Sequence, residues 1–228
     1  MPVEGYAGDG HFRQTYNDIH ILCQETAKRI KTEFNPDLMI AIGGGGFIPA
    51  RIIRTFLKVS DSPESKPRNI PIQAIGLSLY EALPDTSEEV VGKEVIRTQW
   101  LDFSTLGDKN TKYGGLLGKR ILVVDEVDDS RATLSYALQE LQIDVEKQLK
   151  ELKVSEEERS RIREATKFGI FVVHNKLKPK AGEISKDVAY FSGTDIEDLW
   201  VDYPWEMPDI LKHDELKRQD DEMAVKGK

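Results

Sequence analysis

The sequence predicts an α/β fold in which helices flank a mostly parallel central sheet. Short apolar runs alternate along the chain with stretches of helical periodicity. Residues 121–124 are apolar at consecutive positions, which is typical of a strand covered on both faces. Two unusual turns, a run of glycines at residues 43–46 and an acidic run at residues 125–133, directly follow such strands. Ligands bind beyond the carboxyl ends of strands in such sheets, so these turns mark the expected site.

The first third of the chain alternates helix and strand. Asn17 is the expected cap of a helix over residues 18–30, because apolar side chains recur there on one helical face. A buried strand over residues 38–42 precedes the glycines, and helical spacing resumes over residues 47–58. The composition of residues 60–69 indicates a loop before the next strand, which is expected over residues 70–80.

The rest of the chain continues this alternation. Residues 81–92 are polar and are expected to form a long, mobile loop before strand 93–103. Residues 132–165 have helical spacing, but their second half is almost wholly charged and either projects into solvent or starts a second helix. The remaining expected strands span residues 120–125, 168–174, 188–191 and 198–205, and a short helix is expected near the carboxyl terminus.

Composition excludes several classes of protein. The 228 residues carry a formal net charge of −8, which disfavours a general nucleic-acid binder with its basic face. The single cysteine, Cys23, excludes a disulfide framework and a cysteine-rich zinc site, and its place in an apolar stripe predicts a buried structural thiol. Neither a membrane-spanning apolar run nor a signal-peptide pattern is found, so we expect a cytoplasmic protein, with nuclear protein as an alternative.

The acidic run suggests a particular chemistry. Four carboxylates within five residues repel one another unless cations or hydrogen-bond donors lie among them. Ionised Asp125 and Glu126 are acceptors only, so they suit vicinal hydroxyls or a divalent cation. Ser130 and Thr133 offer hydroxyls, and the backbone N–H groups of residues 129–133 favour an anion at the start of a helix. Together these groups match a ribose 5-phosphate.

Other interpretations of the two turns fit less well. An EF-hand calcium loop needs oxygen ligands at alternate positions and a central glycine, and neither is present. No Walker A string occurs, and the glycine run only half matches a dinucleotide fingerprint because Ile48 replaces the last glycine. A solvated acidic turn remains as an alternative, but direct attachment to an apolar strand counts against it.

The string ILVVDEVDDSRAT, residues 121–133, resembles the phosphoribosyl pyrophosphate motif of the type I phosphoribosyltransferases. Four apolar residues, two acids and a hydroxyl-rich loop make up that motif, and the acid at Asp129 is typical of the 6-oxopurine members. The resemblance covers about residues 16–210 and is closest to fungal hypoxanthine-guanine and xanthine phosphoribosyltransferases. Arg131 and Ala132 stand where many members have glycines, so a stiffer loop is expected.

The resemblance implies which residues bind the phosphoribosyl and pyrophosphate groups. Asp129 would be the general base near purine N7, and, crowded by acids, it is expected to have a raised pKa unless amides and metal offset this. The glycine loop would bind pyrophosphate without the basic side chain that related enzymes often carry there. The implied sets are Asp125, Glu126, Asp128, Asp129, Ser130, Arg131, Ala132 and Thr133 for phosphoribosyl, and Gly43, Gly44 and Gly45 for pyrophosphate.

Further roles are implied for the lid and the purine pocket. Ser78 and Tyr80 would open the mobile catalytic loop. Lys176, a donor only, would select a 6-oxopurine, while Trp200 would stack on the ring and the Val201 backbone would face its edge. His174 and Trp205 are expected to be packed in the core. The implied Mg²⁺ ligands are Asp125, Glu126 and Glu206.

The resemblance also implies the activity and the organisation of the chain. A phosphoribosyltransferase domain would span residues 16–212, with a purine-binding hood near residues 176–210, and residues 1–15 and 213–228 would be terminal extensions. The hood would be small and built from terminal segments. We expect transfer of 5-phosphoribosyl to guanine or hypoxanthine by a homodimer. The rivals are a xanthine-selective enzyme and a non-catalytic nucleotide-sensing or RNA-binding regulator.

Overall fold

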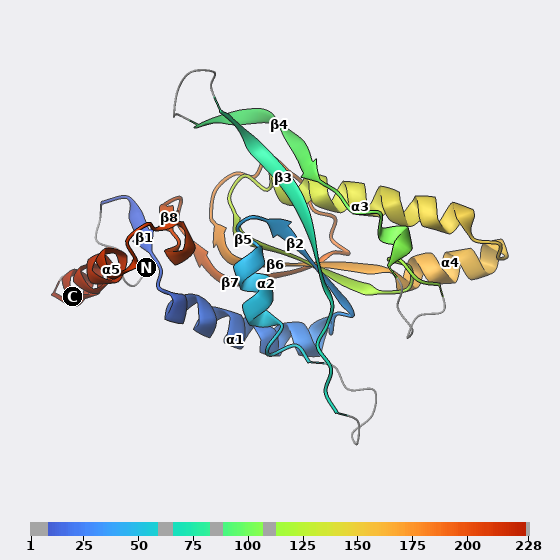
Figure 1. Ribbon diagram of the computed structural model, residues 1–228, viewed down its shortest axis with the longest axis horizontal. Helices are drawn as coiled ribbons and strands as arrows, with labels where there is room; N and C mark the ends of the chain where they lie inside the picture. The colour runs from blue at the N-terminus through green and yellow to red at the C-terminus, as the bar shows by residue number, and fades with distance from the viewer. Residues whose placement is uncertain (1–8, 59–65, 83–88, 107–112, 227–228) are drawn as a thin grey trace.

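A computed structural model describes residues 9–58, 66–82, 89–106 and 113–226 of the chain (Figure 1). Its core is a six-stranded sheet with the strand order β4-β3-β2-β5-β6-β7, in which only the β3–β4 pair is antiparallel. The predicted mostly parallel sheet is therefore confirmed. The strands are β2 (Leu38–Gly43), β3 (Ile72–Ala82), β4 (Glu89–Gln99), β5 (Arg120–Asp128), β6 (Lys167–Lys176) and β7 (Ala189–Ile196).

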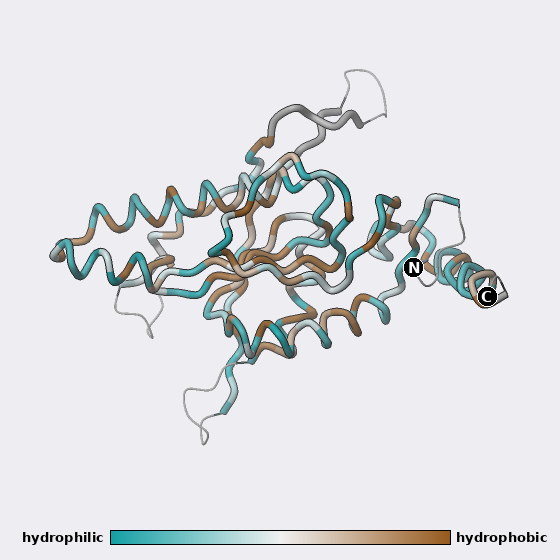
Figure 2. Tube along the Cα trace, turned by 180° about the vertical axis from the view of Figure 1, so that it is seen from behind, coloured by the Kyte–Doolittle hydropathy of each residue, from teal (hydrophilic) through white to brown (hydrophobic). Residues whose placement is uncertain are grey.

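Helices cover both faces of the sheet. One face packs against α1 (Tyr16–Glu33) and α2 (Phe47–Ile53), and the other packs against α3 (Ala132–Glu151) and α4 (Glu156–Ala165). Residues of the central strands alternate between the two layers: Leu122 and Val124 face α1 and α2, whereas Ile121 and Val123 face α3. Figure 2 shows the resulting apolar centre and the hydrophilic outer helices. Cys23 is fully buried in the first layer, as predicted.

Helix α1 begins two residues earlier than expected. The cap is Thr15 rather than Asn17, because the Thr15 hydroxyl accepts from the Asp18 N–H while the Asp18 carboxylate accepts from the Thr15 N–H. This reciprocal capping box satisfies two backbone groups at once. An Asn17 cap would satisfy only one, and the sequence signal of Thr15 with Asp18 three residues later was the stronger one.

Two other boundaries differ from the sequence expectations. Strand β5 extends to Asp128, so the first acids lie on the strand and not after it. Strands β3 and β4 pair as far as Ala82 and Glu89, so most of the predicted loop 81–92 is strand or lies outside the described residues. The charged segment after α3 starts a second helix, which was one of the two expected outcomes. Arg163 of α4 binds Glu146 of α3 at 2.6 and 2.9 Å.

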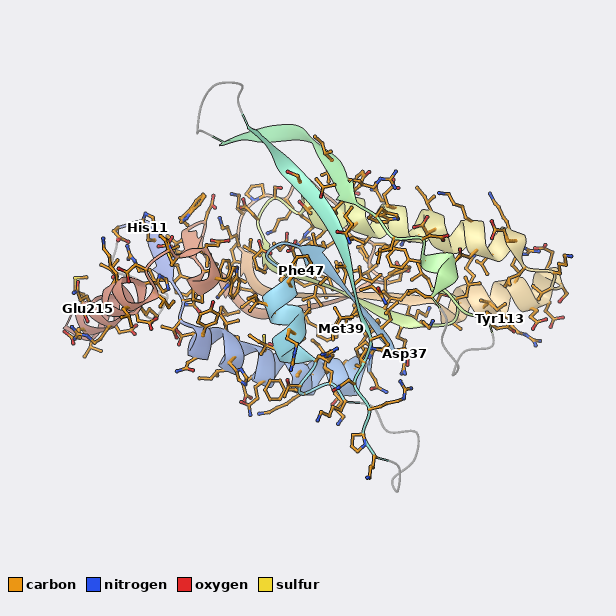
Figure 3. The ribbon with its side chains drawn as sticks, viewed as in Figure 1. His11, Asp37, Met39, Phe47, Tyr113 and Glu215 are labelled. Carbon is orange, nitrogen blue, oxygen red and sulfur yellow. The ribbon has the colours of Figure 1, made fainter. Side chains whose placement is uncertain are left out.

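A small hood stands at the end of the molecule where both termini lie (Figure 1). It contains β1 (His11–Arg13) and β8 (Trp200–Asp202), which pair in parallel, and α5 (Ile210–Lys226), which is longer than the short helix expected. Buried His213 of α5 is 2.8 Å from the backbone oxygen of Gln14. Figure 3 labels His11 of β1 and Glu215 of α5 at this end. Both terminal segments thus help to build the hood, and the domain boundaries at residues 16 and 212 stay a prediction.

The capping box at Thr15 gives a test of the fold. We expect Thr15→Ala to lower the free energy of unfolding by about 1 kcal/mol, because the helix loses its cap. Thr32→Ala is the matched control in the last turn of the same helix, where the hydroxyl bonds the Lys28 carbonyl at an exposed position, and we expect no loss there. Urea unfolding of both variants measures the difference, and equal stabilities would contradict the role of the cap.

Candidate active site

A cavity of about 240 Å³ opens at the carboxyl edge of the sheet, at the ends of β2, β3 and β5. The two turns singled out in the sequence meet in it, because parallel neighbours β2 and β5 end side by side. Most of the predicted phosphoribosyl and pyrophosphate residues line this cavity. The lining includes Gly43, Gly44, Gly45, Leu77, Ser78, Asp125, Glu126, Asp128, Asp129, Ser130, Arg131 and Thr133.

The remaining predicted residues lie away from the cavity wall. Ala132, Lys176, Trp200, Val201 and Glu206 do not line it. The side chain of Tyr80 lies outside the described part of the chain. Lys176 and Glu206 are nevertheless tied electrostatically to residues that do line it.

The acidic pair occupies the cavity floor. Asp125 is buried and accepts a hydrogen bond from the Glu126 N–H at 3.0 Å. Burial, and then the neighbouring charge of Glu126, raise the pKa of Asp125 well above its usual value. The Oε2 atom of Glu126 is buried and has no hydrogen-bond partner among the described residues. The pair therefore offers acceptor capacity that the protein itself leaves unused.

The glycine loop approaches this pair closely. The peptide bond between Gly43 and Gly44 is cis. A Cβ on Gly45 would lie 1.8 Å from the Glu126 carboxyl carbon, and one on Gly46 would lie 2.3 Å from the Val124 carbonyl oxygen. Backbone atoms thus leave no room for a side chain on Gly46, whereas a side chain on Gly45 would have to displace the Glu126 carboxylate. In contrast, a Cβ on Gly44 would meet nothing within 4 Å.

Asp128 is the fully buried member of the acidic run. Arg131 binds its Oδ2 atom through Nε at 2.9 Å and Nη2 at 2.8 Å. The Tyr190 hydroxyl donates to the same oxygen at 2.6 Å. Lys180 lies 3.4 Å from the other carboxylate oxygen. The side chain of Asp128, predicted to bind phosphoribosyl, is therefore committed to protein partners.

Asp129 is paired with one lysine at the end of β6 and one just after it. Its carboxylate lies 2.8 Å from Lys178 and 3.4 Å from Lys176, and both lysines also face Asp198. Burial alone would raise the pKa of Asp129, but the hydrogen bond from Lys178 and the charges of both lysines lower it below its usual value. The expectation of a raised pKa was wrong, because it did not include the two lysines.

The hood contacts the acidic pair through aromatic residues. The Tyr203 hydroxyl donates to the backbone oxygen of Glu126 at 3.0 Å and lies 2.8 Å from Nδ1 of His174. Burial lowers the pKa of His174 to about 3, so this histidine is neutral and packed, as predicted. Trp205 stacks on Tyr203 with a centroid distance of 4.6 Å, which confirms its packed position. Trp200, the predicted stacking residue, is 63% exposed.

The predicted metal ligands fit Mg²⁺ only in part. Carboxylate oxygens suit this ion, and the unpartnered oxygen of Glu126 supplies one. Glu206 is a third carboxylate close enough to Glu126 to feel its charge. Desolvation, followed by the charges of Glu126 and Asp202, raises the pKa of Glu206. Within the described ranges, however, no three such side chains converge on one point. Mg²⁺ commonly binds one or two carboxylates and completes its shell with substrate oxygens and water, which this arrangement allows.

Sequence reasoning missed four residues of the site. Lys178, Lys180, Tyr190 and Tyr203 contact the acidic run from segments at least 49 residues away. The alternating lysines of the string NKLKPK were a usable signal, because they follow a strand whose end lies beside the acidic loop. Nothing in the sequence singled out the two tyrosines.

The fold and cavity define a class of protein, an α/β domain with an acceptor pair and an anion loop at the carboxyl edge of its sheet. Comparison with known proteins narrows the class. A Schizosaccharomyces pombe protein named hypoxanthine-guanine phosphoribosyltransferase is 57% identical over 204 residues, 88% of this chain and 91% of the relative. Xanthine phosphoribosyltransferase 1 of Saccharomyces cerevisiae is 48% identical over 210 residues, 90% and 93% of the two chains. No family model matches the chain.

One solved structure is similar to this chain in both fold and sequence. A hypothetical protein from Neisseria gonorrhoeae with bound ppGpp superimposes with a TM-score of 0.64 at 36% identity, covering 92% of this chain and 96% of that one. On the identity and coverage of the fungal relatives, the chain belongs to the purine phosphoribosyltransferase family. No helix of the described residues is long and apolar enough to cross a membrane.

Two substitutions in the glycine loop should differ in effect. A methyl group on Gly45 must displace the Glu126 carboxylate, whereas one on Gly44 enters open space. Because a misplacement of about 1 Å can cost on the order of 100-fold in rate, we expect Gly45→Ala to lower kcat/KM of phosphoribosyl transfer about 10- to 100-fold. Gly44→Ala leaves that carboxylate in place, so its kcat should fall far less, and its loss should appear as a higher KM for phosphoribosyl pyrophosphate because Gly44 lines the cavity. Steady-state kinetics of both variants test this, and equal losses would contradict the steric argument.

Proposed function

We propose that the protein transfers the 5-phosphoribosyl group of phosphoribosyl pyrophosphate to guanine or hypoxanthine, which yields GMP or IMP and pyrophosphate. The observation that carries this proposal is the cavity in which the acidic pair, the glycine loop and the hydroxyl-rich loop meet. Relatives named for hypoxanthine-guanine phosphoribosyl transfer cover most of the chain and support it.

The cavity suits the sugar and both of its anionic groups. Asp125 and Glu126 present acceptors to the two ribose hydroxyls, and the amides of residues 129–133 receive the 5-phosphate. The bare backbone of the glycine loop can approach the pyrophosphate closely because it has no Cβ atoms in the way. The protein's task is to align the sugar carbon with the attacking purine nitrogen and to exclude water.

Mg²⁺ is part of the proposal, held by Glu126 with Asp125 or Glu206. When bound, it would supply Lewis-acid stabilisation of the charge that leaves on pyrophosphate. The glycine loop lacks a basic side chain, and Arg51, which follows it on α2, is exposed and points its guanidinium to Thr55. Backbone N–H groups of the loop therefore carry the rest of that charge.

Asp129 is the proposed base near purine N7. Its lowered pKa keeps the carboxylate ionised at neutral pH, so it can accept a proton. Lys176 approaches the same carboxylate at 3.4 Å and is a donor only, which suits the O6 atom of an oxopurine and disfavours a 6-amino group. The ion pair of Lys178 with Asp129 occupies part of this space, so the incoming base must displace Lys178 towards Asp198.

Xanthine is the second candidate base, and the 48% identical xanthine enzyme of Saccharomyces cerevisiae favours it. A non-catalytic nucleotide sensor is the other rival, while the net charge of −8 counts against an RNA-binding role. We further propose a homodimer in the cytoplasm or partly in the nucleus, which rests on the family resemblance and on composition.

A competition assay tests the proposed function. Purified protein with phosphoribosyl pyrophosphate and an equal mixture of guanine, hypoxanthine, xanthine and adenine should form GMP and IMP fastest and no AMP. Addition of EDTA should abolish turnover, and excess Mg²⁺ should restore it. Formation of XMP alone would favour the xanthine-selective enzyme, and binding of nucleotide without any turnover would favour the sensor.

The role of Asp129 gives a separate prediction. We expect Asp129→Asn to lower kcat by about 100-fold or more, because general base catalysis typically contributes about 10²–10⁴-fold. The Kd for GMP should change only a few-fold, since the amide keeps the shape of the side chain. Asp214→Asn, the same charge change on an exposed turn of α5, is the control. Equal losses in kcat and in nucleotide affinity would show that Asp129 is structural.

A further inference from the structure

Lys180 does not line the cavity, and it contacts the phosphate loop, residues 128–133, from the outer side. Its Nζ donates to the backbone oxygens of Asp128 at 2.6 Å and of Asp129 at 3.0 Å. The next two residues continue the contact, because the N–H groups of Ala181 and Gly182 donate to the Ser130 oxygen at 2.9 and 3.2 Å. Three consecutive carbonyls of the loop are thus bound from one side.

We propose that Lys180 is a positioning residue that sets the phosphate cradle, with Arg131, Tyr190 and buried Asp128 as its support. This inference rests on the proposed function, because the cradle is taken to hold the 5-phosphate of the sugar. It adds a role for a side chain that does not itself line the cavity.

The geometry of the peptide unit carries the argument. In a planar trans peptide, the C=O of one residue and the N–H of the next point in opposite directions. The carbonyls of Asp128, Asp129 and Ser130 point to the segment 180–182. The N–H groups of residues 129, 130 and 131 must therefore point the other way, towards the side of the loop that lines the cavity. Lys180 fixes the direction of two of these three donors.

Electrostatics acts in the same direction. A cation on a carbonyl oxygen polarises the peptide, so the N–H on its far side becomes a stronger donor to an anion. Arg131 and Lys180 both bring a positive charge to the carboxylate of Asp128, beside the loop. Tyr190 holds the Asp128 carboxylate, and the Arg131 guanidinium lies 5.2 Å from the centre of its ring.

Residues 180–182 pack tightly against the backbone of the phosphate loop. A Cβ on Gly182 would lie 2.4 Å from the Arg131 carbonyl oxygen, so the two chains pack backbone against backbone. Arg131 itself has a φ of 68°, a left-handed conformation that glycine adopts readily and arginine rarely does. Its two hydrogen bonds to Asp128 compensate for that strain. Arg131 stands where many family members have glycine, and its hydrogen bonds to Asp128 help to hold the loop in place.

Substitution of Lys180 should weaken binding of the phosphate group but not of the purine base. Because Lys180 orients two of the amides that would bind the phosphate, Lys180→Gln should raise the Kd for ribose 5-phosphate and the KM for phosphoribosyl pyrophosphate about 10-fold. The KM for guanine should stay within about threefold. Lys180→Arg keeps a cation and should recover most of the affinity.

Calorimetry with ribose 5-phosphate and steady-state kinetics measure these changes. Lys147→Gln, which removes an exposed lysine charge on α3, is the matched control and should leave all values unchanged. Tyr190→Phe keeps the ring but frees Asp128, and it should weaken ribose 5-phosphate binding in the same direction if Lys180→Gln does not fold. Unchanged ribose 5-phosphate affinity in folded Lys180→Gln would overturn the inference, as would equal changes in both KM values without rescue by arginine.

The binding assay also separates this inference from the proposed function. If the wild-type protein binds ribose 5-phosphate but turns over none of the four bases, the proposed function fails. Weaker ribose 5-phosphate binding by Lys180→Gln would then still support the positioning role.

Discussion

Four carboxylates within five residues must be held apart at the end of one buried strand, and the site is built around this constraint. Each acid receives a different environment. Asp125 is buried with a raised pKa, Asp128 is bound by Arg131 and Tyr190, and Asp129 is paired with lysines. Glu126 keeps a buried oxygen without a hydrogen-bond partner among the described residues. Groups that lie beside each acid thus offset the repulsion among the four carboxylates, and one acceptor is left for a ligand.

The end of β6 and the segment that follows it supply most of the compensating charge. Lys176, Lys178 and Lys180 alternate along this stretch, and each reaches the acidic run. The base site and the phosphate loop are therefore held by one short piece of chain. Because β6 is the parallel neighbour of β5, its end lies beside the end of β5 without a long connection. The topology of the sheet thus determines which segment can neutralise the acids.

The sequence could predict the sheet and the cavity because both depend on local patterns. Consecutive apolar residues marked β5, and the turns after β2 and β5 marked the edge at which ligands bind. The state of Asp129 could not be predicted in this way, because its lysines come from about 50 residues away. The start of α1 was predicted two residues too late for a different reason. Thr15 and Asp18 form the cap of the helix together, and Asn17 does not take part. Long-range charge pairs are therefore the part of the site that local patterns leave out.

A crystal structure of the protein with GMP tests the central claim most directly. The account predicts the 5-phosphate oxygens within about 2.7–3.2 Å of backbone nitrogens of residues 129–133. It also predicts the ribose hydroxyls against Asp125 and Glu126, with Lys180 still on the outer side of the loop. A phosphate bound outside this cavity, or held by side chains while those nitrogens point away from it, would contradict the account.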